Sequence, residues 1–153
     1  SYATALTDSS FDISIAGLIN GSLDALLRLP GSTPTQPLLA ITDYKSNKLH
    51  HDTDTAPIAS YSPLHVQAKM EEAHYILQAL IYGTSIYRML RWRLPEADHD
   101  ACIKGIAYGF IRGMVGPDTP TDENGHRYGV FTWQAPTGLW RALSDLFAGS
   151  KPA

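Results

Sequence analysis

The stretch at residues 42–47, TDYKSN, places an acid and a lysine two residues apart. It follows the apolar run LLAI, so we expect it to end a buried β-strand. Residues two apart in a strand point to the same face, which places Asp43 beside Lys45 and turns Tyr44 to the other face. An isolated aspartate and lysine of this kind usually form a surface ion pair worth less than ~1 kcal/mol. A catalytic interpretation therefore needs a further partner.

That partner is Asp24, an acid inside the apolar run SLDALLRL, where it is costly without a compensating group. If its strand pairs antiparallel with the strand before Lys45, Asp24 and Asp43 lie close enough to share one cation. Mg²⁺ prefers a few carboxylate or carbonyl oxygens and retains several waters. A lysine beside such a metal can orient an attacking water or neutralise charge on a phosphate. This set of residues suits hydrolysis of a phosphodiester.

The N-terminal third of the sequence has the pattern of β-structure. Three stretches are expected to be strands: residues 11–19, 22–29 and 38–45. Asn20-Gly21 is a common two-residue hairpin turn, and three prolines and a glycine make residues 30–37 a loop. The second strand is apolar on both faces except at Asp24 and Arg28, which predicts a central position in the sheet.

Helical periodicity begins at residue 62 and ends before Pro95. One unbroken helix would be ~48 Å long, so we expect a break near residues 73–75. Three further elements follow: a strand in 102–114, a short strand in 128–133 and an amphipathic helix in 137–147. The order β-β-β-α-β-β-α predicts an α/β fold in which helices pack on a mixed sheet.

Composition limits the classes of function. A chain of 153 residues that is 44% hydrophobic forms one domain with a real core. The single cysteine, Cys102, excludes an internal disulfide and a cysteine-based zinc site. No run is apolar enough to cross a bilayer and no signal pattern opens the sequence, so we expect a cytoplasmic protein without a membrane partner. Because the net charge is -3, any surface that binds nucleic acid must be a local group of positive residues.

Five segments of the sequence resemble the RecB-type nucleases of the PD-(D/E)XK superfamily: GSLDALLRL, LLAITDYKSN, HYILQALIYGTSIYRMLRWRLP, IAYGFIRGM and GVFTWQAP. The resemblance covers most of the chain and implies that residues 1–153 are one RecB-type nuclease domain of a longer helicase-nuclease chain. It implies a restriction-endonuclease-like mixed sheet flanked by helices. It also implies that Asp24, Asp43 and the backbone carbonyl of Tyr44 bind Mg²⁺, where Mn²⁺ or Ca²⁺ can also sit, and that Lys45 is catalytic.

The same resemblance assigns catalytic roles to Gln78 and Tyr82. Helical spacing independently places both on one polar stripe with Glu71 and Tyr75, since residues three and four apart share a helix face. A solvated helix face is the alternative explanation of this stripe.

One departure from the family concerns a histidine ligand that it places well upstream of the first acid. No histidine occurs among the 23 residues before Asp24, so we expect the N-terminal part of the fold to lie outside this sequence. We therefore expect the isolated chain to bind metal weakly and to cut DNA poorly.

The partners implied by the resemblance are DNA, RecC-like and RecD-like subunits and the helicase part of the parent chain, in a bacterial cytoplasm. The implied role is double-strand-break repair and recombination. Two alternatives remain open. One is a non-catalytic scaffold that guides DNA, against which the intact Asp24, Asp43 and Lys45 argue. The other is an AddA-like parent chain.

Overall fold

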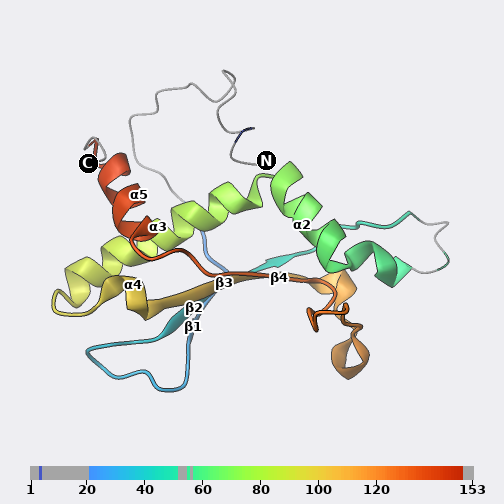
Figure 1. Cartoon of the computed structure of the whole chain (residues 1–153), viewed down its shortest axis with the longest axis horizontal. Coiled ribbons are helices and arrows are strands. Elements are labelled where there is room, and N and C mark those ends of the chain that lie inside the picture. Colours follow the sequence, from blue (N-terminus) through green and yellow to red (C-terminus); the bar gives the residue numbers. More distant parts are fainter. Residues whose placement is uncertain (1–3, 5–20, 52–54, 56, 150–153) are drawn as a thin grey trace.

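The computed structural model describes residues 4, 21–51, 55 and 57–149. In these ranges the chain forms an α/β fold with one four-stranded sheet and helices packed on it (Figure 1). The strands are β1 (Ala25–Arg28), β2 (Leu39–Lys45), β3 (Ile103–Phe110) and β4 (Val130–Trp133). The helices are α2 (Pro63–Glu72), α3 (Tyr75–Arg93), α4 (His99–Cys102) and α5 (Leu139–Phe147), with 3-10 turns η2 (Pro57–Tyr61), η3 (Ile111–Gly113) and η4 (Gly116–Asp118). The predicted fold class is confirmed, and over the described residues the element order agrees apart from the short helix α4, which was not predicted.

The sheet is mixed, with strand order β1-β2-β3-β4. β1 pairs antiparallel with β2, β2 pairs parallel with β3, and β3 pairs antiparallel with β4. A parallel pair needs a long crossover, and here α2 and α3 provide it. The antiparallel pairing of β1 with β2 is the arrangement that the two acids require.

The predicted central position of β1 is wrong for the sheet that the described residues form. β1 lies at its edge, and Leu26 and Leu27 are 37% and 45% exposed. Leucines on both faces indicated burial, yet composition alone cannot tell a two-sided core strand from an edge strand with exposed apolar residues. The strand predicted at residues 11–19 lies outside the described residues.

The helical region breaks where the spacing predicted. α2 ends at Glu72, and His74 adopts a left-handed backbone conformation with φ of 55° before α3 begins at Tyr75. The backbone N–H of Gln78 donates to the His74 carbonyl at 3.2 Å, which closes the first turn of α3. The break separates Glu71 from the face of α3, so the predicted four-residue polar stripe is not continuous.

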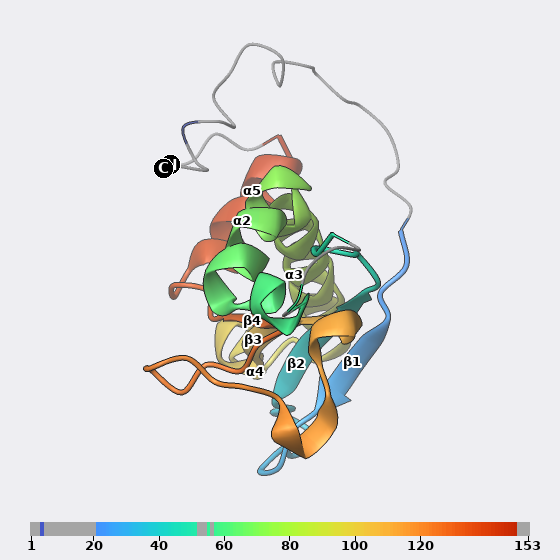
Figure 2. The ribbon, with the colours of Figure 1, turned by 90° about the vertical axis from the view of Figure 1, so that its right-hand side faces the viewer.

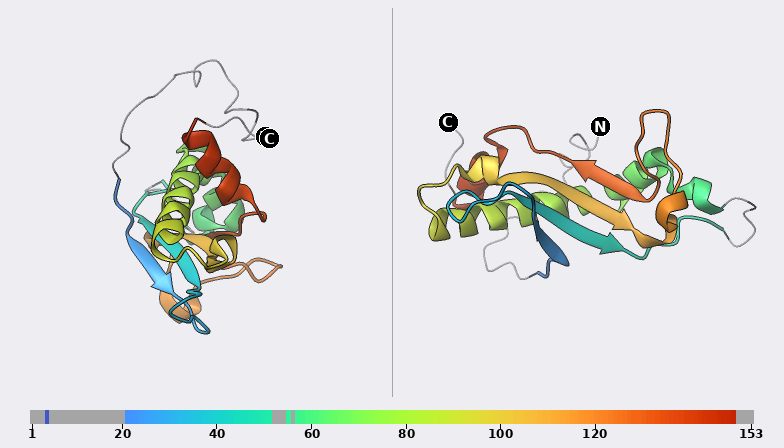
Figure 3. Two further views of the ribbon diagram at one scale, coloured as in Figure 1. Left: turned by 90° about the vertical axis from the view of Figure 1, so that its left-hand side faces the viewer. Right: turned by 90° about the horizontal axis from the view of Figure 1, so that it is seen from below.

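Helices α2, α3 and α5 lie on the same face of the sheet (Figures 2 and 3). α3 and α5 approach closely because Gly83 leaves room for the Trp140 ring; a Cβ at Gly83 would lie 2.3 Å from that ring. The core between sheet and helices contains buried residues of both layers, among them Ile41, Val66, Met70, Ala79, Tyr87, Leu90, Ile106, Tyr108, Phe110 and Trp140. Within the described ranges, no helix combines the length and the apolarity needed to span a bilayer.

Candidate active site

Two acids meet where β1 begins and β2 ends. The register pairs Ala25 with Thr42, so the next residues outward, Asp24 and Asp43, are neighbours across the two strands. The Oδ2 atom of Asp24 accepts a hydrogen bond of 2.8 Å from the backbone N–H of Tyr44, which fixes the first acid against the second strand. Asp43 is buried, with 4% of its surface exposed. The predicted antiparallel pairing of these two strands is therefore confirmed.

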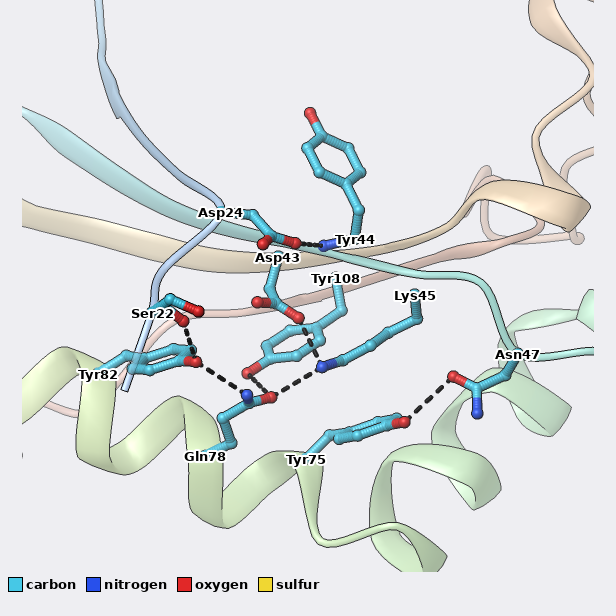
Figure 4. A network of polar contacts seen from close by, with 10 residues as sticks. All are labelled: Ser22, Asp24, Asp43, Tyr44, Lys45, Asn47, Tyr75, Gln78, Tyr82 and Tyr108. Carbon is cyan, nitrogen blue, oxygen red and sulfur yellow. Dashed lines mark hydrogen bonds and ion pairs between the residues drawn. The ribbon is translucent and has the colours of Figure 1, made fainter. Parts of the chain in front are cut away.

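Lys45 shares the face of Asp43, as residues two apart in a strand do. Its Nζ atom lies 2.6 Å from Asp43 Oδ2, and its side chain is 12% exposed. The ammonium also donates to Gln78 Oε1 at 2.9 Å and so links β2 to α3. The Tyr44 ring projects away from these groups (Figure 4) and is 54% exposed.

Gln78 is the centre of a hydrogen-bond network. Its Oε1 accepts from Lys45 and from the Tyr108 hydroxyl at 3.2 Å, while its Nε2 donates to the Tyr82 hydroxyl at 2.9 Å. Two donors on one oxygen fix the orientation of the amide. Burial, followed by the negative charge of Asp43, raises the pKa of Tyr108, so its hydroxyl stays protonated and acts as the donor.

Tyr82 extends the network to the segment that carries the first acid. Its hydroxyl donates to the carbonyl of Ser22, two residues before Asp24. Gln78 and Tyr82 are one helical turn apart, which lets them reach Lys45 and Ser22 from the same side of α3 (Figure 4). The spacing of these two residues thus ties both strand ends to one helix.

All of the predicted site residues lie in one connected region: Asp24, Asp43, Tyr44, Lys45, Gln78 and Tyr82. Glu71 does not join them, because it lies in α2, where it accepts a hydrogen bond from Gln67 at 3.3 Å.

Tyr75 is a site residue to which the sequence assigned no role. The Lys45 Nζ atom lies 3.9 Å from the centre of its ring and 5.2 Å from the centre of the Tyr108 ring. The Tyr75 hydroxyl donates to Asn47 Oδ1 at 3.1 Å. Its place on the polar stripe, three residues before Gln78, was the available signal, but spacing gives no indication that a lysine lies over the ring.

The two residues after Lys45 are held through their backbone carbonyls. The Ser46 carbonyl accepts from Arg112 Nε at 2.9 Å, and the Asn47 carbonyl accepts from the Tyr61 hydroxyl at 3.1 Å. Tyr61 is fully buried. The strand end that carries Lys45 is therefore anchored to η3 and to η2.

The oxygen atoms at the site suit the coordination of a divalent cation. Apart from the ion pair with Lys45, the buried Oδ2 atom of Asp43 has no hydrogen-bond partner among the described residues. Two carboxylates and the carbonyl of Tyr44 are ligands that Mg²⁺ accepts together with water. In the part of the chain that the structure describes, no cluster of three or more His, Cys, Asp or Glu residues could hold a metal. The protein ligands at this site are thus few.

Comparison with known proteins gives one consistent relationship. No family model matches the chain. The RecBCD enzyme subunit RecB of Mycobacterium tuberculosis (strain ATCC 25618 / H37Rv) is 42% identical over 146 residues, which are 95% of this chain and 12% of that protein. The RecB subunit of Mycolicibacterium smegmatis is 36% identical over 152 residues, 99% of this chain and 13% of that protein. The RecB subunit of Escherichia coli (strain K12) is 27% identical over 135 residues, 88% of this chain and 10% of that protein.

The chain is thus a RecB-related segment, and it spans only 10% to 13% of the length of these relatives.

Proposed function

We propose, from the relation of this chain to RecB subunits, that it is a nuclease domain that hydrolyses DNA phosphodiesters with Mg²⁺ in double-strand-break repair and recombination. The observation that carries the proposal is the contact between a buried acid and a lysine, Asp43 and Lys45, next to Asp24, whose carboxylate accepts from the Tyr44 N–H. Acids can hold a metal that polarises a phosphate, and an adjacent ammonium can stabilise the charge that develops on it.

In this proposal Asp24, Asp43 and the carbonyl of Tyr44 hold Mg²⁺, and Mn²⁺ or Ca²⁺ can replace it. When bound, the metal offsets negative charge on the reacting phosphate. Lys45 contributes a fixed positive charge next to Asp43, placed to stabilise charge that develops on a phosphate oxygen or to orient the attacking water. Gln78 holds the ammonium in place through its amide oxygen, and Tyr82 holds the segment that carries Asp24.

The relatives are named as subunits of the RecBCD enzyme. We extend this to the chain and propose that its partners are DNA, RecC-like and RecD-like subunits and the helicase part of its parent chain, in a bacterial cytoplasm. Because the relatives at 42% and 36% identity are RecB subunits, a RecB parent is favoured over an AddA-like one.

The test uses the full-length parent protein with its partner subunits. Lys45→Ala removes the ammonium from the site and is expected to lower the rate of Mg²⁺-dependent degradation of linear DNA ~100-fold or more. Lys104→Ala is the matched control, since Lys104 is an exposed lysine of β3, and it should retain the parental rate. Parental activity in Lys45→Ala would contradict the proposal.

A second experiment concerns the isolated chain. With only two carboxylates at the site, we expect weak Mg²⁺ binding and little cleavage from the chain alone. Calorimetric titration with Mn²⁺, with Asp43→Asn as control, measures the binding. Strong Mg²⁺-dependent cleavage that Lys45→Ala abolishes would show that an upstream ligand is dispensable.

A further inference from the structure

Lys45 lies among more groups than an ion pair requires. Its ammonium has Asp43 Oδ2 at 2.6 Å, Gln78 Oε1 at 2.9 Å and the face of the Tyr75 ring at 3.9 Å. The Tyr108 ring lies nearly parallel to the Tyr75 ring, with the ring centres 6.1 Å apart. A cation over the face of an aromatic ring is attracted by the ring quadrupole, and the attraction grows as water is excluded.

We propose that Tyr75 is a positioning residue for Lys45 and that Asn47 holds the Tyr75 ring in place. The expected effect of Tyr75 on turnover rests on the proposed nuclease function. The expected effect of Tyr75 on the position of Lys45 does not depend on that function.

The first reason is the freedom of the lysine side chain. A four-carbon stem carries a compact charge through many rotamers, and a single ion pair does not select one of them. The Tyr75 ring adds a flat attractive surface, while Asp43 and Gln78 supply the oxygens at its side (Figure 4). These contacts together define one position for the Nζ atom.

The second reason is that the ring is itself fixed. Tyr75 opens α3 directly after the left-handed His74, so the backbone break sets the direction of its side chain. At the far end of the ring, the hydroxyl donates to Asn47 Oδ1 at 3.1 Å. Asn47 is anchored in turn, because its carbonyl accepts from the buried Tyr61 hydroxyl. The motif DYKSN thus supplies both the lysine and the residue that holds the ring under it.

The third reason is chemical. A further carboxylate beneath Lys45 would hold the ammonium equally well, but it would also compete for a divalent cation at Asp24 and Asp43. An aromatic face attracts the ammonium and offers no oxygen ligand to such a cation. Tyr75 would therefore hold Lys45 in position also with a metal bound at Asp43.

The first test measures the lysine directly, by competitive acetylation of all lysines in the full-length protein with acetic anhydride and quantification by mass spectrometry. Tyr75→Leu removes the ring and is expected to raise the labelling of Lys45 ~5-fold relative to Lys104, whereas Tyr75→Phe keeps the ring and should stay within ~2-fold. Tyr128→Leu is the matched control, since Tyr128 lies in the loop before β4, and its labelling pattern should equal that of the parent.

Unchanged Lys45 labelling in a folded Tyr75→Leu protein would overturn the proposal. If Tyr75→Leu does not fold, judged by thermal unfolding, then Asn47→Ala and Tyr75→Phe decide the role of Asn47. Each removes one end of the same hydrogen bond, so the double variant should label like the single variants. Additive increases in labelling would overturn that role.

The second test measures kcat and KM separately for DNA cleavage by the full-length protein with its partner subunits. Tyr75→Leu is expected to lower kcat ~10-fold and to leave KM within ~2-fold, because the ring acts on the lysine and not on DNA binding. A change in KM alone would overturn a positioning role. If Lys45→Ala leaves cleavage intact, the proposed function fails, while the labelling result still decides whether Tyr75 positions the lysine.

Discussion

At the scale of single residues, the amide of Gln78 determines how the site is connected. One oxygen accepts from Lys45 and from Tyr108, and the nitrogen donates toward Tyr82. An amide side chain can accept at one end and donate at the other. A carboxylate at this position would lose the donor toward Tyr82 and add a negative charge beside Asp43.

Gln78→Leu is expected to lower the free energy of unfolding of this chain by ~1–3 kcal/mol, because the Tyr108 hydroxyl loses its partner. Urea denaturation measures the change. Gln67→Leu provides the control, since Gln67 is exposed on α2 and its loss should change stability by less than ~0.5 kcal/mol. Equal effects of the two substitutions would mean that the Gln78 network contributes nothing specific.

At the scale of elements, α3 connects the two strands that carry the acids. Its Gln78 contacts Lys45 of β2, and its Tyr82 contacts Ser22, just before β1. The helix therefore sets the distance between the segment of Asp24 and the end of β2. The break at His74 gives α3 its own direction, independent of α2.

Tyr82→Phe should loosen the segment that carries Asp24 and leave the ring in place. In the full-length protein we expect cleavage to need ~3- to 10-fold more Mg²⁺ for half-maximal rate, with recovery at saturating metal, since second-layer contacts commonly change metal affinity by 10-fold or more. A Mg²⁺ titration of DNA cleavage measures this, with Tyr128→Phe as the control. An unaltered Mg²⁺ dependence would argue against a link between Tyr82 and the proposed metal ligands.

At the scale of the whole molecule, a net charge of -3 means that the proposed DNA contacts must come from local positive groups. Arg112 is such a group. It is exposed, and its Nε donates to the Ser46 carbonyl, one residue after Lys45. This backbone contact fixes the guanidinium at the edge of the site without neutralising its charge.

Arg112→Gln is expected to weaken DNA binding by the full-length protein and to reduce the slope of log K against log salt concentration by about 1. Fluorescence anisotropy with labelled DNA at several salt concentrations measures the slope. Arg127→Gln, in the exposed loop before β4, should leave the slope unchanged. An equal decrease of the slope in both variants would indicate a general effect of net charge.

The sequence predicted those parts of the site that depend on short-range geometry. Period-2 strand pairing brought Asp24 beside Asp43 and put Lys45 on the same face, and helical spacing aligned Gln78 with Tyr82. The edge position of β1 in the sheet of the described residues could not be predicted, because exposed and buried leucines look alike in sequence. The contact of Tyr75 with Lys45 depends on how a helix lies across a sheet, which no local pattern encodes.

The parallel pairing of β2 with β3 has a consequence for how such a domain can diversify. Strands that run in the same direction finish at a common rim, so the residues after Lys45 and those after Phe110 share one border of the sheet. The connections that leave this rim can lengthen or change composition while the helices beneath stay in place. For the proposed nuclease, this rim is therefore where substrate preference can change without rebuilding the lysine environment.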